Sequence, residues 1–544
     1  MNKKLVKIIA LVMSFAMLFT IGTVMPVSAT DGAEEVPEVS AIEKGFFNFT
    51  DVLVNGLVSA IAAIIPAPLS WVDEADYNSE YVPAGTDVFL DTPAEGAQWS
   101  LGYAQESILE GQQVLGNSHY VSGGISITAK YPTKIVDDSK VRVIAMNDGS
   151  GRGTVVFAVI DAYGLANNDV KEIRKRIDAF AKANNIVSVN VSVLHQHSAV
   201  DTFGMNGDIV QAVFLNPAIN LINNIAGKKL IDTHNGKNDK FQNNLFDVTV
   251  DAIESAVANM ETGKLMYGEV DVSEYLRDKR PPYALENTLN RFRFIPDDET
   301  SKETWFSTSE IHCVGNGVQG TEITADYPYY MEEYVNKNAN ANFMLALGAE
   351  LATGQRHEPF ENEDYAGKEG YMILGERLGE KLVSITEERE IAPLLNITHK
   401  EVYFEIENQI MYLAAKAGLF ENQAIKTADG IRLVSEVGYM EMGTDIAIAL
   451  VPGELEASIA FGGALTSETS WSGEDWGYKS MQEMVGDREL LVIGLCNDQM
   501  GYIVPTNDYM PMLWEDSKSI EFVSLGSQTA ITYIEAFASL VNSK

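Results

Sequence analysis

The sequence predicts an α/β protein: a mixed-sheet domain with flanking helices and a metal site at the C-terminal ends of its strands. From about Tyr77 onward, apolar strand-like runs alternate with amphipathic helices, and no low-complexity linker or internal repeat interrupts them. Polar residues gather where the apolar runs stop. In open α/β sheets, ligands bind beyond the carboxyl ends of the strands, so these residues are candidates for one site.

Residues 1–29 predict a secretory signal peptide. Three lysines precede an apolar run, and "VSA" precedes Thr30, which places cleavage after Ala29. The alternative is a membrane anchor. We therefore expect an exported protein, either secreted or at the cell surface.

Residues 30–76 predict a linker followed by an apolar helical segment. The linker is acidic and contains proline, and the apolar stretch runs from Gly45 to Trp71. This stretch is short for a transmembrane span, an Asn-Gly pair interrupts it, and Pro66 ends it. We expect a helix packed on the core. The alternative is an interfacial helix that contacts a membrane surface transiently or handles a lipid substrate.

Residues 77–544 predict one large α/β domain with a βαβ unit near its start. "TVVFAVID" (residues 154–161) is typical of a strand, and "NNDVKEIRKRIDAFAKA" (residues 167–183) of a helix with Asn168 as its cap. A second strand follows over Val187–Leu194. One face of the helix carries four apolar residues: Val170, Ile173, Ile177 and Phe180. Later segments repeat this pattern, at residues 342–350, 445–454 and 489–498.

Charge and cysteine content exclude some classes of partner. The net charge is −38, from 39 basic and 77 acidic residues. Nucleic-acid binding needs a basic surface, so we expect no nucleic-acid partner, and electrostatic docking on anionic lipid is disfavoured too. Cys313 and Cys496 are the only cysteines. Two cysteines do not make a disulfide framework, and we expect both to be free thiols.

Metal-ligand residue types stand at several predicted strand ends. His195 and His197 end one strand, and His312, Glu454 and Tyr502 follow others. Two His and one Glu, with water at an open position, form a catalytic Zn²⁺ pattern. The two-residue period of a strand would point both histidines of the H-x-H pair the same way. The alternative is an ordinary hydrogen-bonded histidine, which is our interpretation of the rest: His119, His234, His357 and His399.

Three stretches resemble motifs of the neutral ceramidase family. "VLHQHSAVDTFG" resembles its H-T-H-S-G-P-x-G motif, "LVPGELEASIAF" its V-P-G-E-x-T-T segment, and "GLCNDQMGYIVPTNDY" its G-L-x-N-x-Y-x-x-Y-x-x-T-x-E-E-Y segment. "STSEIHCVG" and "TADYPYY" are similar to its W-F-x-x-H-P and S-D-N-x-G-Y segments. The likeness runs from about Tyr77 to Lys544, and it identifies the chain as a divergent member of the family's catalytic domain.

The resemblance implies a zinc-dependent amidohydrolase that cleaves the amide bond of an N-acyl lipid such as ceramide. Carried over motif by motif, it assigns zinc binding to His195, His312, Glu454 and Tyr502. It places His197 beside the ion, where it supports a ligand or contacts the substrate. Together with Tyr502, His197 and Asp326 are the candidate catalytic residues, Asp326 matching the aspartate of the S-D-N segment.

One loop departs from the family pattern. The family carries a G-D-V-S-P-N loop whose serine contacts the head of the substrate, whereas residues 347–359 of this chain read "LGAELATGQRHEP". Glu350, Thr353 and His357 are the candidates to occupy that space. The departure leaves two alternatives open. One is a zinc amidase or esterase for another acyl compound, and the other is a non-catalytic binding protein on the same fold.

Overall fold

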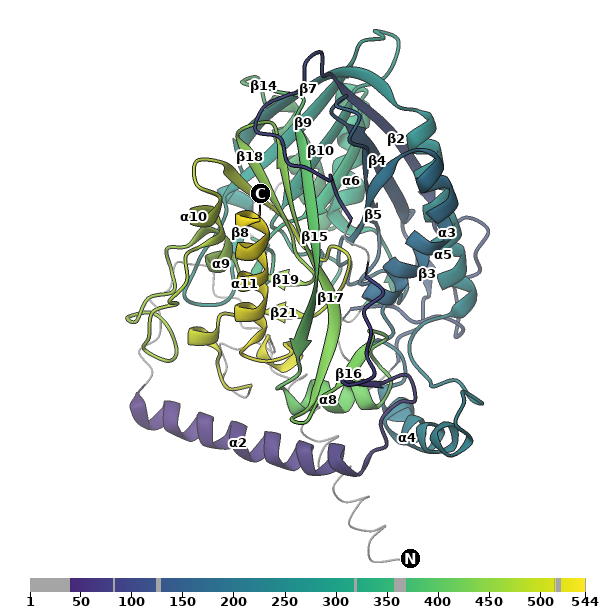
Figure 1. The fold of residues 1–544 in the computed structure, drawn as a ribbon, viewed down its shortest axis with the longest axis vertical. Helices are drawn as coiled ribbons and strands as arrows, with labels where there is room; N and C mark the ends of the chain where they lie inside the picture. The colour runs from purple at the N-terminus through teal and green to yellow at the C-terminus, as the bar shows by residue number, and fades with distance from the viewer. Residues whose placement is uncertain are drawn as a thin grey trace, which may run out of the picture.

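The computed structural model describes residues 40–543, apart from residues 82–83, 124–128, 318–319, 357–367, 513 and 515–519. Within these residues the chain forms two stacked β-sheets surrounded by helices (Figure 1). The predicted mixed α/β fold is confirmed. The predicted signal peptide, the first part of the predicted linker and His357 lie outside the described residues.

The larger sheet contains nine strands among the described residues and mixes parallel with antiparallel pairs. β5 runs parallel to β6, and β10 parallel to β12. Across the sheet the order is β12 (Asn342–Leu347), β10 (Thr304–Ser309), β9 (Thr288–Pro296), β7 (Glu261–Asp271), β2 (Trp99–Ser107), β4 (Lys140–Asn147), β5 (Thr154–Ile160) and β6 (Ile186–Val193), with β14 (Arg389–Ile391) beside β7.

The smaller sheet contains six strands within the described residues, and three short strand pairs lie outside both sheets. Its order is β1 (Val72–Asp73), β16 (Ala424–Lys426), β17 (Ile431–Met442), β18 (Ile446–Leu450) and β20 (Glu489–Ile493), with β15 (Leu395–Glu405) also pairing with β17. The short pairs are β3 (Lys134–Ile135) with β11 (Glu322–Ile323), β8 (Leu276–Asp278) with β13 (Thr353–Gln355), and β19 (Glu454–Leu455) with β21 (Tyr502–Ile503).

The main core lies between the two sheets. Along β18, Ile446, Ile448 and Leu450 belong to the cluster of buried residues that includes the nine-stranded sheet. Ala447 and Ala449 belong to a second cluster, which includes the last helix, α11 (Thr529–Asn542). The two-residue period of a strand separates these two sets of side chains. β18 is therefore buried on both faces, which explains its continuous apolar run.

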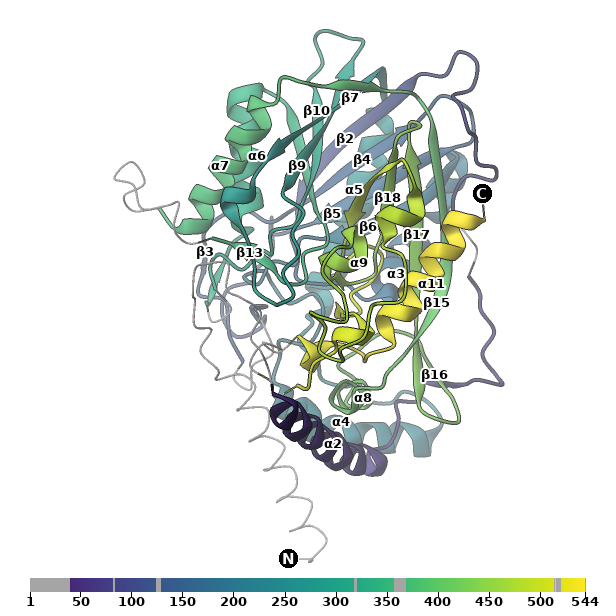
Figure 2. The same ribbon diagram turned by 90° about the vertical axis from the view of Figure 1, so that its left-hand side faces the viewer.

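Helices pack around the sheets (Figure 2). α3 and α5 lie against the larger sheet, and α6 and α7 pack together against its other end. With α11, the α-helices in the described part of the chain are α2 (Ala41–Ile64), α3 (Asn167–Ala183), α4 (Ile209–Ala226), α5 (Asp239–Ala258), α6 (Asp326–Ala339), α7 (Gly370–Ser384), α8 (Gln409–Lys416), α9 (Ala457–Phe461) and α10 (Met481–Val485).

The predicted βαβ unit is present as β5, α3 and β6. Val170, Ile173 and Ile177 of α3 are buried, as the helical period predicts. The predicted cap at Asn168 is wrong by two residues, because α3 begins after Ala166. The Asp169 side chain accepts a hydrogen bond from the Ala166 N–H (2.9 Å) and so satisfies the N-terminus of the helix.

The predicted apolar helix is α2, but only one side of it packs on the protein. Val58, Ile61 and Ala62 form a small buried cluster with Ile410 and Leu413 of α8. Much of the opposite side is exposed. The expectation of a helix packed on the core therefore holds for one face.

A short segment after β20 joins the two sheets. The Gly494 N–H donates to the Leu347 carbonyl at the end of β12 (2.8 Å), and the Asn497 N–H donates to the Val191 carbonyl of β6 (2.7 Å). The Asn497 side chain accepts from the Val191 N–H in return (2.9 Å). Asn497 has a φ of 65°, a left-handed conformation that Asn adopts more readily than most residues. These bonds set the smaller sheet in register with the larger one.

A buried ion pair supports this junction. Arg174 of α3 binds both oxygens of Glu436 on β17 (3.1 and 2.8 Å), and the Asn497 amide donates to Glu436 Oε1 (2.9 Å). Burial raises the pKa of Glu436, but the Arg174 guanidinium outweighs it and lowers that pKa to about 2. The stabilisation is present above pH 4.5, the ordinary pKa of the carboxyl, and is lost as the pH falls towards 2.

We predict that Arg174→Met lowers the free energy of unfolding by about 3 kcal/mol or more, because it leaves a buried carboxylate without its cationic partner. Urea unfolding at neutral pH measures this. Arg176→Met is the matched control: the side chains of Arg174 and Arg176 are 22% and 23% exposed, but the Arg176 partner Asp247 is 69% exposed and Glu436 is 2% exposed. The control should cost less than about 1 kcal/mol. Equal losses in the two variants would contradict the prediction.

Candidate metal centre

The two histidines of the H-x-H pair lie in a turn, not in an extended strand. β6 ends at Val193, and His195 has a φ of 47°. The strand-period explanation for this pair is therefore wrong. Gln196 instead fixes the turn, because its amide donates to Asp161 Oδ1 (3.0 Å) and to the Ala325 carbonyl (2.7 Å). The turn still brings the two imidazoles together, with ring centroids 4.7 Å apart.

Asp161 can anchor this turn because it is itself held rigidly at the end of β5. Its carboxylate accepts from Arg142 Nη1 (3.0 Å) and from the Lys140 N–H (2.8 Å). Arg142 also donates to Glu332 of α6, and all three charged side chains are buried. A buried, fully paired charge network is geometrically specific, so it positions the residues that follow β5 and β6.

Parallel pairing brings further ligand-type residues to the same place. β10 and β12 are paired so that Ser309 lies opposite Leu347, and His312 and Glu350 each follow three residues later. After β18 and β20 of the smaller sheet, the chain forms the short pair β19 and β21, in which Glu454 lies opposite Tyr502. The cluster is therefore assembled from both sheets, at the C-terminal ends of their strands.

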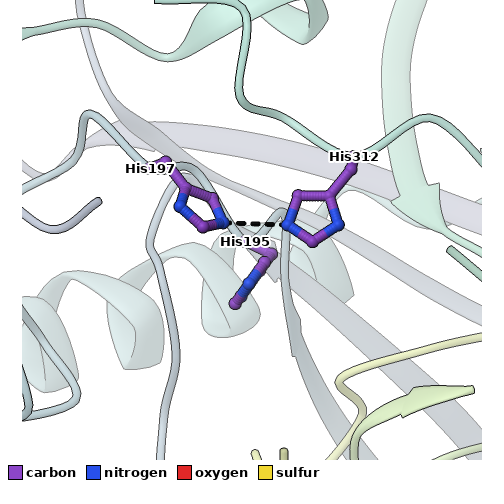
Figure 3. Close-up of side chains that lie close together, drawn as sticks. All are labelled: His195, His197 and His312. Carbon is purple, nitrogen blue, oxygen red and sulfur yellow. Dashed lines mark hydrogen bonds between the residues drawn. The ribbon is translucent and has the colours of Figure 1, made fainter. Parts of the chain in front are cut away.

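Three imidazoles meet at the centre of the cluster (Figure 3). His197 Nε2 is 2.8 Å from His312 Nε2, and the rings of His195 and His312 are 4.8 Å apart. His195 Nδ1 lies 2.8 Å from the Tyr163 carbonyl oxygen, so Nδ1 carries the proton and donates it. Nε2 of His195 then has its lone pair free, and no protein group bonds to it.

Two buried glutamates complete the cluster. Glu350 Oε2 lies 2.7 Å from His312 Nδ1. Glu454 Oε2 lies 3.4 Å from His195 Nε2 and 3.8 Å from His312 Nδ1. His195, His197 and His312 form one group with metal-ligand spacing, and His312, Glu350 and Glu454 form a second. Because His312 belongs to both groups, the five side chains make one continuous cluster.

The titration of the cluster follows from its burial. Burial lowers the pKa of His312 to about 3 and lowers those of His195 and His197 well below the ordinary value. Burial raises the pKa of Glu350 to about 8, and burial and the neighbouring Glu350 raise that of Glu454. The histidines are therefore neutral, which is the form that binds metal ions. A cation between the two carboxylates would reverse their shifts, because it favours the charged form.

The donor set fits a zinc ion. His195 Nε2 and Glu454 Oε2 are buried without a hydrogen-bond partner, although polar atoms in protein interiors are normally paired. Two ligands about 2.1 Å from a tetrahedral Zn²⁺ ion are roughly 3.4 Å apart. His195 Nε2 and Glu454 Oε2 are 3.4 Å apart, which matches this spacing. Imidazole nitrogen and carboxylate oxygen are also the ligand types of catalytic zinc sites.

The remaining predicted site residues lie around the cluster. Tyr502 is half-buried, and a hydrogen bond links its hydroxyl to Glu454. Asp326 begins α6, and its carboxylate accepts from the N–H groups of Gly315 (2.9 Å) and Tyr327 (2.7 Å). Asp326 thus holds the loop that follows His312. Cys313 and Cys496 are buried free thiols, as predicted.

Sequence reasoning missed two residues that contact the cluster and left a third without a role. The Tyr163 ring stacks on His195 with centroids 4.3 Å apart, and the Gln499 amide donates to Glu454 Oε1 (3.1 Å). Tyr163 stands two residues beyond Asp161, at a strand end, which is the signal that could have found it. Glu350 was only one of three candidates for an unmatched loop, and the structure places it against His312.

No protein-family model matches the chain, and no curated protein matches it in sequence. Solved structures do match, among them a ceramidase complexed with C2 and the neutral ceramidase from Pseudomonas aeruginosa. Each gives a TM-score of 0.57 at 14% identity over 82% of this chain, covering 75% and 74% of the two solved chains respectively. The chain therefore has the fold of the neutral ceramidases.

Proposed function

We propose that the protein is a divergent neutral ceramidase-like hydrolase, exported and zinc-dependent. Its reaction is the addition of water to the amide bond of an N-acyl lipid such as ceramide, which releases a fatty acid and an amine. The observation that carries this proposal is the buried His/Glu cluster, whose members follow strand ends of both sheets in a ceramidase fold. The three sequence motifs that resemble the family contribute His195, His197, Glu454 and Tyr502 to the same place.

The proposed zinc ligands are His195, His312 and Glu454, with Tyr502 beside them. The Tyr163 carbonyl fixes the tautomer of His195 by accepting a hydrogen bond from its Nδ1–H, which leaves Nε2 for the ion. The Glu350 carboxylate lies 2.7 Å from His312 Nδ1, the place that carboxylates take beside zinc-bound histidines in other sites. Gln499 holds Glu454 through one oxygen and leaves the other, Oε2, without a protein partner.

A bound zinc ion supplies Lewis-acid chemistry: it lowers the pKa of its water towards roughly 7 and polarises the acyl carbonyl. The chain's own residues supply orientation and hydrogen bonding. Burial raises the pKa of the Tyr502 hydroxyl well above its ordinary value, so this group stays protonated and can donate to the developing oxyanion. His197 is neutral and adjoins His312, where it can contact the same carbonyl. Asp326 acts through the loop after His312 and is a positioning residue in this proposal.

A second candidate function is a zinc amidase or esterase that acts on a different acyl compound. Residues 347–359 lack the G-D-x-S sequence, and Glu350 lies against His312 in this segment. A buried carboxylate at that position changes what the head of a substrate meets. This candidate shares the metal centre and differs only in substrate.

We predict one zinc ion per chain, measured by elemental analysis of purified protein. The His195→Ala and Glu454→Ala proteins should each lose the ion, because each lacks one proposed ligand. The binding atoms of these two ligands have no hydrogen-bond partner in the protein. His234→Ala, which changes an exposed histidine, should keep it. A protein that retains full activity after exhaustive chelation would refute the metal proposal.

We predict that His197→Ala keeps its zinc but loses about ten- to hundredfold in turnover, the usual effect of removing a group next to a metal ligand. His195→Ala changes the same residue type in the same turn and should abolish turnover. Zinc content and kcat of the two variants are the measurements. Complete zinc loss in His197→Ala would make His197 a ligand instead.

The substrate proposal is tested with a panel of N-acylsphingosines and other acyl amides and esters. We expect release of free fatty acid from N-acylsphingosine by the wild-type protein and none by Glu454→Ala. Fatty-acid release is measured by mass spectrometry. If the same zinc site cleaves another acyl compound and leaves every N-acylsphingosine intact, the ceramidase proposal is wrong and the second candidate replaces it.

A further inference from the structure

Helix α4 has the opposite polarity to an ordinary surface helix. Its side chains are described from Ala212 on, and its exposed positions are almost all apolar: Phe214, Leu215, Ala218, Leu221, Ile222 and Ile225. Ile225 is 80% exposed, whereas Asn216 on the inner face is fully buried. The helix contains no charged residue. Surface helices normally turn their polar face to water, so α4 is inverted.

Three buried asparagines hold α4 on the protein. The Asn216 side chain donates to the His234 carbonyl (2.7 Å), Asn220 to the Lys416 carbonyl (2.9 Å) and Asn223 to the Ile231 carbonyl (2.9 Å). Burying an amide is favourable only when it is hydrogen-bonded, and these amides are. These hydrogen bonds fix the polar face of α4 against the protein. The apolar face must therefore point outward.

Helix α2 presents a similar outward stripe. Its residues at 42, 46, 49, 53, 56, 60 and 64 are Ile, Phe, Phe, Leu, Gly, Ala and Ile, and all are exposed. This spacing of three and four places them on one face of a helix. Ile42 is 86% exposed, and Phe46 and Phe49 are each 61% exposed. The stripe carries no charge.

By length and composition α2 is apolar enough to cross a membrane, and no other described helix is. Its contacts hold it along the protein instead. Lys44 donates to the Trp471 carbonyl (2.7 Å), and Asp51 accepts from the Met512 N–H (3.2 Å). At its C-terminal end Lys416 donates to the Ala62 carbonyl (2.9 Å). A spanning helix would lose these bonds, so α2 fits a position parallel to a surface.

Both helices lie at the same end of the molecule, as the two perpendicular views show (Figures 1 and 2). They are linked there, because Asn224 of α4 donates to the Ala67 carbonyl just beyond α2 (2.9 Å). We call the exposed stripes of α2 and α4 the apolar end face. Large contiguous apolar surfaces on soluble proteins mark sites of protein or membrane contact.

We infer that the apolar end face docks on the surface of an uncharged or zwitterionic lipid bilayer. Neither stripe offers a charge to a protein partner, and apolar helices that lie in a bilayer interface bury such a stripe. A second copy of the chain would bring two net charges of −38 together, which opposes self-association. A neutral bilayer does not oppose docking in this way. This inference does not depend on the proposed hydrolase activity.

The test is flotation of the protein with phosphatidylcholine vesicles, with the full chain and with the form cleaved after Ala29. We expect binding that is nearly independent of salt. Phe46→Glu/Phe49→Glu in α2 and Phe214→Glu/Ile225→Glu in α4 should each weaken it by about tenfold or more, because they remove apolar burial. Ala183→Glu/Asn338→Glu is the matched control, on exposed positions of α3 and α6, and should bind like the wild type.

Absence of vesicle binding by the wild-type protein would overturn the inference, and so would equal binding by all variants. If the protein forms a dimer in lipid-free solution and the same α2 and α4 variants disrupt it, the apolar end face is an interface between two copies and the inference is wrong. Ile225→Trp keeps the surface apolar, so it tests the inference even if the glutamate variants fail to fold. Its added fluorescence should be quenched by brominated phosphatidylcholine, and an unquenched signal would exclude contact of α4 with the acyl chains.

Discussion

The centre of the molecule depends on the hydrogen bonds that join the two sheets after β20. Gly494 bonds to the end of β12, and Asn497 bonds to β6 in both directions. The histidines and Glu350 follow strands of the larger sheet, whereas Glu454 and Tyr502 lie on β19 and β21, the short pair that follows β18 and β20 of the smaller sheet. If the sheets slid relative to each other by one residue, Glu454 would no longer face His195. The junction therefore determines the geometry of the candidate metal centre.

The cluster also explains why so much polar structure is buried around it. Uncompensated carboxylates are costly in a protein interior, and Glu350 and Glu454 are both buried within a few ångströms of the same histidine. A divalent cation bound between them would offset that cost. The surrounding anchors, Asp161 with Gln196 and Asp326 with the loop after His312, are hydrogen bonds within the protein itself. A hydrogen-bonded frame thus surrounds a cluster of buried imidazoles and carboxylates that could hold a metal ion.

Local patterns predicted the parts of the structure that local forces determine. The β5–α3–β6 unit was predicted from apolar periodicity. Because ligands bind beyond the carboxyl ends of strands, His195, His312, Glu454 and Tyr502 were predicted to form one group. The turn at His195 did not follow, because a bond between Gln196 and Asp161 imposes it. Glu350 also did not follow, because only the pairing of β10 with β12 brings it to His312. Long-range contacts of this kind leave no spacing in the sequence.

The asparagine bonds of α4 make the apolar end face a preformed surface. Apolar packing alone allows a helix to rotate or slide with little change in energy, but amide–carbonyl bonds are directional and fix its rotation. A segment that folds only on binding gives up conformational entropy at that moment, and its affinity falls accordingly. α4 has already lost that entropy during folding of the chain. Its affinity for an apolar phase is then governed by the area it covers, with almost no reorganisation to oppose it.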